Sequence, residues 1–112
     1  FEASTYLHFV DECRKLGIRV PILPGLLPVT SLEQAQRFCG FCGATLPETL
    51  KTKLSGAPAE EQWKVGADWT FHQIKLLIES GDAPGAHLYI MNRSESLLRL
   101  IHKLREEKLF GV

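Results

Sequence analysis

The residues with the clearest chemical potential lie near the C-terminal end of the chain, where an apolar run gives way to the polar pair Asn92-Arg93. The run covers residues 88–91 and is typical of a strand buried under helices on both faces. Ser94 follows as a helix N-cap. Binding residues of parallel α/β proteins gather at the carboxyl ends of strands, so we look for function first at Arg93.

A second chemical pattern is the C-x-x-C sequence formed by Cys39 and Cys42. A redox-active pair needs its first cysteine at a helix N-terminus, but this pair is predicted to end a helix. A zinc site would need about two further ligands, and none of the four histidines is suitably spaced. We therefore predict neither a metal site nor a redox site, although a C-x-x-C oxidoreductase remains an alternative.

The remaining patterns predict helices that alternate with two strands. The first helix runs from Ser4 or Thr5 to about Leu16, and residues 18–23 form the first strand, with a turn-rich exit at residues 24–28. Further helices are predicted from residue 32 to about residue 39 or 41, over residues 47–54, and from about residue 60 to residue 80. A last helix follows Ser94, leaving a charged tail after Leu104. The long helix owes its prediction to one apolar face, formed by Trp63, Ala67, Phe71, Ile74 and Ile78.

Two strands joined through helices should pair in parallel, but sheets usually contain about four to six strands. The fold class that follows is α/β, and specifically the C-terminal portion of a (β/α)₈ TIM barrel. We expect residues 1–112 to form one part of such a barrel, without a second domain.

The composition of the chain argues against several classes of protein. Hydrophobic residues make up 45% of the chain, and 13 basic residues balance 13 acidic ones, so a general binder of nucleic acid or of anionic membranes is not expected. The apolar residues 20–29 are interrupted by three prolines and are too few to span a bilayer. Three cysteines and no signal-peptide pattern favour a cytoplasmic protein.

Three stretches, in order, resemble the methylenetetrahydrofolate reductase family. They are residues 17–28 (Gly-Ile-Arg-Val-Pro-Ile-Leu-Pro-Gly-Leu-Leu-Pro), 31–38 (Ser-Leu-Glu-Gln-Ala-Gln-Arg-Phe) and 87–93 (His-Leu-Tyr-Ile-Met-Asn-Arg). Phe1-Glu2-Ala3 and Gly66 also stand where the family has similar residues.

The resemblance implies a barrel flavoprotein in which NAD(P)H reduces FAD, and the reduced flavin converts methylenetetrahydrofolate to 5-methyltetrahydrofolate. The acidic residues that assist this chemistry and most FAD contacts belong to earlier strands of the family, so no catalytic residue is expected in this chain. The chain alone is expected to be inactive, and the full-length enzyme is a candidate homo-oligomer.

The resemblance also implies a folate-binding set of residues in this chain. Gln34 and Arg93 match the substrate-binding glutamine and arginine, and Phe38 and Met91 would pack against the flat part of the folate. Tyr89 could lean toward the flavin. Without the resemblance, the same residues read as an exposed glutamine, core apolar side chains and a surface arginine. The alternative function is therefore a stand-alone, non-catalytic α/β interaction module.

Overall fold

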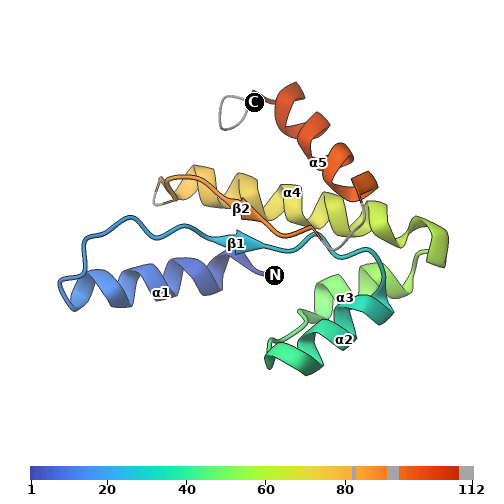
Figure 1. The fold of residues 1–112 in the computed structure, drawn as a ribbon, viewed down its shortest axis with the longest axis horizontal. Helices are drawn as coiled ribbons and strands as arrows, with labels where there is room; N and C mark the ends of the chain where they lie inside the picture. The colour runs from blue at the N-terminus through green and yellow to red at the C-terminus, as the bar shows by residue number, and fades with distance from the viewer. Residues whose placement is uncertain (82, 91–93, 109–112) are drawn as a thin grey trace.

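The computed structural model describes residues 1–81, 83–90 and 94–108, and it consists of helices and two short strands, with helices packed against one side of the strands (Figure 1). In chain order the elements are α1 (Ala3–Lys15), β1 (Gly25–Leu26), α2 (Leu32–Cys42), α3 (Glu48–Ser55), the single 3₁₀ turn η1 (Ala59–Glu61), α4 (Gln62–Ser80), β2 (His87–Leu88) and α5 (Ser94–Glu106). All five predicted helices are present, with ends that differ from the prediction by at most three residues.

The two strands pair in parallel, as predicted. Gly25 lies opposite His87 and Leu26 opposite Leu88. The His87 amide donates to the Pro24 carbonyl at 2.8 Å, and the Tyr89 amide donates to the Leu26 carbonyl at 2.9 Å. Because the pair is parallel, both strands end on the same side of the molecule.

The predicted first strand over residues 18–23 is wrong, since pairing begins only at Gly25. The backbone oxygens before it bond to side chains of α1: Arg14 Nη1 donates to the carbonyls of Ile18 and Val20 at 2.8 and 3.0 Å, and Tyr6 donates to that of Ile22 at 2.5 Å. Pro21 and Pro24 contribute no ladder donor. This segment is therefore extended without being part of the sheet.

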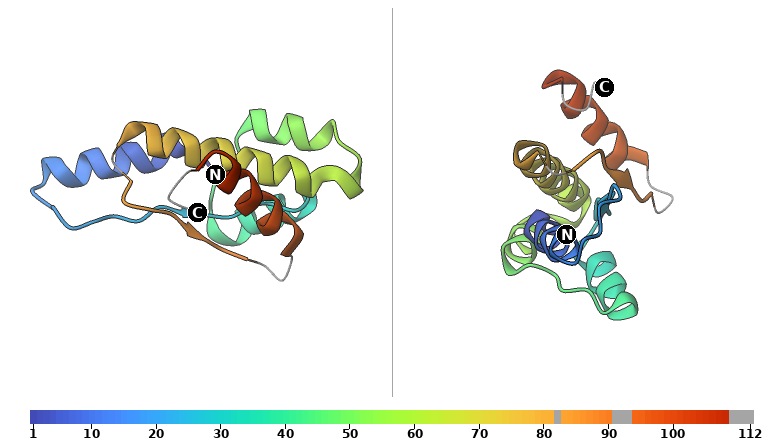
Figure 2. Two further views of the ribbon diagram at one scale, coloured as in Figure 1. Left: turned by 90° about the horizontal axis from the view of Figure 1, so that it is seen from above. Right: turned by 90° about the vertical axis from the view of Figure 1, so that its left-hand side faces the viewer.

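The second strand was predicted to be buried on both faces, and this is also wrong for the residues that follow His87 and Leu88. Tyr89 and Ile90 are each 52% exposed, and Met91 lies outside the described residues. The reason is that α4 covers one side of the strands, while the side views show no described element over the opposite side (Figure 2).

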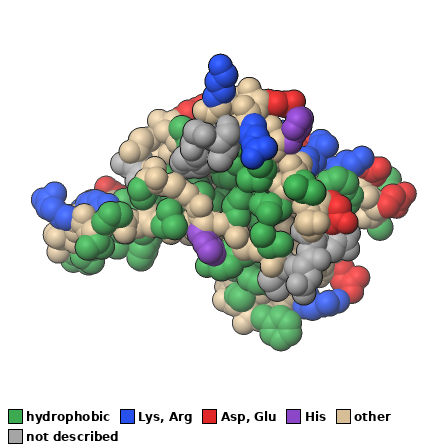
Figure 3. Space-filling model, turned by 45° about the horizontal axis from the view of Figure 1, so that its top comes forward, with side chains coloured by type: hydrophobic (Ala, Val, Ile, Leu, Met, Phe, Trp, Pro, Cys, Tyr) green, Lys and Arg blue, Asp and Glu red, His purple; other side chains and the backbone are tan. Residues whose placement is uncertain are grey.

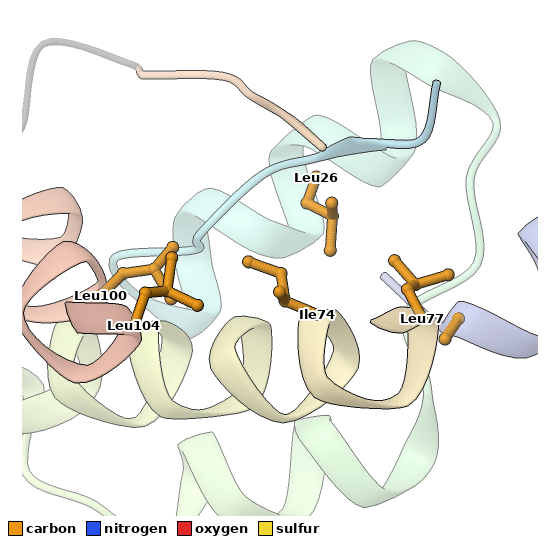
Figure 4. Close-up of a cluster of buried hydrophobic side chains, with 6 residues drawn as sticks. Leu26, Ile74, Leu77, Leu100 and Leu104 are labelled. Atoms are coloured by element: carbon orange, nitrogen blue, oxygen red, sulfur yellow. The ribbon is translucent and has the colours of Figure 1, made fainter. Parts of the chain in front are cut away.

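The core on the covered side is organised by α4. Leu26 of β1 packs there against Ile74 and Leu77, and Leu100 and Leu104 of α5 close the same cluster (Figure 4). A second buried cluster joins the exit of β1 to α2 and α3 and contains Val29, Ala35, Leu50 and Leu54. Both clusters fix the segments that leave the carboxyl ends of β1 and β2.

The predicted apolar face of α4 is only partly confirmed. Ala67 and Ile74 are fully buried, whereas Phe71 is half-buried and the polar Gln73 is 6% exposed. Gln73 is accommodated because its Oε1 accepts a hydrogen bond from the Ala3 amide at 2.8 Å. The buried stripe of α4 is therefore partly polar where it receives the start of α1.

The described helices show no stretch with the length and apolarity that crossing a membrane requires.

Gly66 allows α4 to approach the segment after β1. A Cβ atom there would overlap the carbonyl oxygen of Val29, which is backbone and has no freedom to move aside. We predict that Gly66→Ala lowers the free energy of unfolding by about 2 kcal/mol or more, despite the better helix propensity of alanine. Thermal or urea denaturation measures the change.

Gly40 provides the matched control, because it lies within α2 and an added Cβ atom would meet no atom of a described residue within 4 Å. Gly40→Ala is expected to be neutral or to stabilise by up to about 1 kcal/mol. Equal changes in the free energy of unfolding for Gly66→Ala and Gly40→Ala would contradict the close approach of α4 to the backbone of Val29.

Candidate functional site

A small hollow lies at the carboxyl ends of the two strands. We call it the strand-end hollow; its lining consists of Pro28, Thr30 and Gln34 from the segment after β1, and Tyr89, Ile90, Ser96 and Leu97 from the segment after β2. About 10 Å³ of it is open to the centre of a water molecule. The fold therefore brings two segments, some 60 residues apart in sequence, to the location where parallel α/β proteins bind ligands.

Gln34 is held in a defined orientation at this hollow. Ser31 caps α2 as predicted, its Oγ accepting from the Gln34 amide at 3.0 Å, and the Gln34 side-chain oxygen accepts from the Thr30 amide at 2.8 Å. A backbone N–H can only donate, so the side-chain atom that faces Thr30 must be the oxygen. The Gln34 Nε2 group, which no described residue engages, is left as a donor for other partners.

Phe38 lies one turn beyond Gln34 but does not line the hollow. Its half-buried ring meets the ring of Phe1 edge to face, with centroids 6.4 Å apart. Its role against a ligand stays a prediction.

Tyr89 lies at the rim, on the open side of the strands. Its ring lies over Gly25, where an added Cβ atom would be 2.7 Å from Tyr89 Cε2, and it meets the His87 ring at 4.6 Å. The bare backbone of Gly25 thus leaves the room that this ring occupies. A contact between Tyr89 and a flavin stays a prediction.

Met91 and Arg93, the two other predicted ligand-binding residues, lie outside the described residues. Ile90 and Ser96, which flank them in sequence, both line the hollow. The roles of Met91 and Arg93 also stay predictions.

Ser96 is a polar residue of the hollow that sequence reasoning missed. Its side chain is buried, at 3% exposure, and its hydroxyl has no hydrogen-bond partner among the described residues. A signal was present in the sequence, because Ser96, Leu100 and Leu104 recur every four residues and are the buried positions of α5. Extending the leucine spacing back by one turn would have predicted a buried serine.

An ion-pair network positions α5, and with it Ser96, on α4. Asp68 of α4 accepts from Arg99 through both carboxylate oxygens, at 2.9 and 3.2 Å, and its Oδ1 lies 2.9 Å from Lys103 Nζ. Partial burial alone would raise the pKa of the Asp68 carboxyl, but these two cations together hold its pKa below the ordinary value.

The cysteine pair lies at the end of α2, as predicted. Cys39 is half-buried, Cys42 is exposed, and both thiols are free. Within residues 1–81, 83–90 and 94–108, no three His, Cys, Asp or Glu side chains are grouped as metal ligands would be.

A larger cavity, of about 430 Å³, lies between α3 and α4 and is lined in part by Lys53, Trp69 and His72. Among the described residues, none from the segments that follow β1 and β2 lines this cavity. Since size alone does not identify a site, we favour the strand-end hollow, where both of these segments converge.

Comparison with known proteins gives a consistent result. A family model described as methylenetetrahydrofolate reductase matches residues 1–105. The chain is 33% identical over 106 residues to 5,10-methylenetetrahydrofolate reductase of Salmonella typhimurium, which covers 93% of this chain and 36% of the relative. It is 32% identical over 113 residues to a probable methylenetetrahydrofolate reductase (NADPH) of Caenorhabditis elegans, covering 99% of this chain and 17% of the relative.

A plant relative, methylenetetrahydrofolate reductase (NADH) 1 of Arabidopsis thaliana, is 26% identical over 106 residues, covering 93% of this chain and 18% of the relative. The chain thus spans about a third of the bacterial relative's length and under a fifth of the two eukaryotic ones.

The Asp68 network predicts a stability that depends on pH. A carboxyl whose pKa is lowered by folding stabilises the protein above its unfolded pKa, roughly 4, and this contribution is lost as the pH falls through the folded pKa. We predict that Asp68→Asn lowers the free energy of unfolding at pH 7 by about 1 kcal/mol. The difference from the unmodified protein should shrink as the pH falls below about 4, which denaturation at several pH values measures.

Asp11→Asn is the control, since Asp11 pairs with Lys15 on the exposed face of α1, at 3.1 Å. Asp11→Asn should lower the free energy of unfolding at pH 7 by less than Asp68→Asn does. A difference between Asp68→Asn and the unmodified protein that stays constant from pH 7 to pH 3 would rule out the ion pair as its cause.

Proposed function

Because the chain belongs to the methylenetetrahydrofolate reductase family, we propose that it forms the folate-binding part of an enzyme that reduces 5,10-methylenetetrahydrofolate to 5-methyltetrahydrofolate. The reductant in this proposal is NAD(P)H and the cofactor is FAD. The names of the relatives include both NADH and NADPH, so the proposal covers both donors.

One observation carries the proposal: Gln34, from the segment after β1, shares the strand-end hollow with Ile90 and Ser96, which flank the Asn92-Arg93 pair. A folate is long, flat and anionic at one end, and its recognition needs hydrogen bonds at separate points. Two strand-following segments that meet at one hollow are suited to provide them.

We propose that the fold is the C-terminal part of a (β/α)₈ barrel. The parallel pair, its helical crossover and the packing of α4 on one side agree with a barrel wall that carries its helices outside. Leu23, Tyr89 and Ile90 are more than half exposed, and hydrophobic side chains form a band across the face seen in Figure 3. Such side chains would be covered in a closed barrel, whose interior is filled by residues of all its strands.

In this proposal each ligand-binding residue has a separate task. Gln34 donates from Nε2 to an acceptor of the folate, because Thr30 already engages its oxygen. Arg93 pairs with the carboxylate of the glutamate tail through its planar fork. Phe38 and Met91 provide apolar contacts to the flat part of the molecule.

FAD supplies the hydride that reduces the folate when it is bound. The half-exposed Tyr89 ring beside the bare Gly25 backbone fits a flat aromatic group at the open side of the strands. We assign no catalytic residue to this chain, whose task is to bind and orient the folate.

Replacing Arg93 tests the proposal in the full-length protein that contains this chain. Arg93→Ala should raise the KM for methylenetetrahydrofolate roughly 10- to 100-fold, as expected for the loss of charge-assisted hydrogen bonds of about 1.5–3 kcal/mol. The reduction of bound flavin by NAD(P)H should stay nearly unchanged, because Arg93 is assigned to the folate alone. Stopped-flow absorbance follows the two half-reactions separately.

Arg37→Ala is the matched control, since Arg37 lies on the exposed face of α2 and pairs with Glu33 at 2.8 Å. It should leave both half-reactions unchanged. An unaltered folate KM in Arg93→Ala would remove Arg93 from the folate site.

A further inference from the structure

We propose that Ser96 is a positioning residue of the folate site, which orients the Gln34 carboxamide through one ordered water molecule in the strand-end hollow. The inference rests on the proposed function and adds to it a residue from the first turn of α5.

The Ser96 hydroxyl needs a partner that the described residues do not provide. It is buried at 3% exposure, and a buried hydroxyl without a hydrogen bond is unfavourable and uncommon. The same side chain lines the strand-end hollow. A partner delivered through that hollow would satisfy it.

The size and lining of the hollow favour a single water molecule. About 10 Å³ open to water centres is close to the space that one water needs. A buried water typically makes about three hydrogen bonds. Four residues of the lining carry polar side chains, Ser96, Thr30, Gln34 and Tyr89, and the Tyr89 hydroxyl lies against Gly25. Other lining residues, such as Pro28 and Leu97, have apolar side chains. Ser96, Thr30 and Gln34 are therefore the side chains that would bind the water.

The two ends of the Gln34 carboxamide then have different tasks. The Thr30 amide holds the oxygen at 2.8 Å, and the water accepts from one N–H of Nε2. The second N–H of Nε2 is left to donate to the folate. When the Gln34 carboxamide is already fixed before the folate binds, binding costs less conformational entropy. Ser96 should therefore affect folate affinity rather than hydride transfer.

Ser96→Ala in the full-length holoenzyme tests the proposal. We expect the KM for methylenetetrahydrofolate to rise about three- to tenfold, the loss of roughly one hydrogen bond, with kcat within twofold. NAD(P)H reduction of the flavin and the thermal midpoint should not fall. Ser55→Ala is the control, because its exposed hydroxyl bonds to the Lys51 carbonyl in α3, away from the strand ends, and it should change none of these values.

A double-mutant cycle with Gln34→Ala tests whether Ser96 acts through Gln34. If it does, Gln34→Ala raises the folate KM, and adding Ser96→Ala to it raises the KM no further. Independent, multiplying effects would overturn the proposed route. A folate KM that Ser96→Ala leaves unchanged while Gln34→Ala raises it would overturn this inference alone, whereas no effect of Gln34→Ala would overturn the assigned folate contact as well.

A crystal structure of the holoenzyme gives an independent readout. We expect a water within hydrogen-bond distance of Ser96 Oγ and Gln34 Nε2, and its loss in Ser96→Ala. A Ser96 hydroxyl bonded directly to a backbone carbonyl, with no such water, would contradict the proposal.

Discussion

The parallel pairing of β1 with β2 is the constraint on which the site depends. Two backbone hydrogen bonds, from His87 to Pro24 and from Tyr89 to Leu26, align strands that are separated by about 60 residues and three helices. Because the strands run in the same direction, the segments that follow them emerge together. An antiparallel pair would place Gln34 and Ser96 at opposite ends of the sheet.

The helices convert this pairing into a fixed geometry. α4 packs Ile74 and Leu77 against Leu26, and its Gly66 permits close contact with the backbone of Val29 just before the hollow. Gln62, at the start of α4, accepts from the Leu32 amide at 2.9 Å and donates to the Leu54 carbonyl at 3.0 Å. One helix therefore sets the position of both α2 and α3, and the Asp68 network adds α5.

The helices could be predicted from sequence because their signals are local. Ser31 caps α2, Gly43 and Gly81 end α2 and α4 with φ of 66° and 75°, and apolar spacing gives the rest. The strand positions could be predicted less accurately than the helices, because the residues that pair in a sheet depend on a partner strand that is distant in sequence. Residues 18–23 have the composition of a strand, but their carbonyls find donors on α1 instead.

The candidate site also combines features that local sequence patterns predict with features that depend on distant residues. The location of Gln34 at a strand end followed from motif and order, but the orientation of its carboxamide depends on the Thr30 amide, which no pattern reveals. Ser96 was missed because a serine near a helix start is usually interpreted as a cap or a solvated residue. Ser96 is buried because α5 packs on α4. Its spacing from Leu100 and Leu104 places it on the same buried face of α5.

A crystal structure of the full-length protein with a folate bound tests most directly whether the two strand ends form one ligand site. We predict that the folate lies at the carboxyl ends of β1 and β2 and accepts a hydrogen bond from Gln34 Nε2. A folate bound in the cavity between α3 and α4, or at any place out of reach of Gln34, would contradict this.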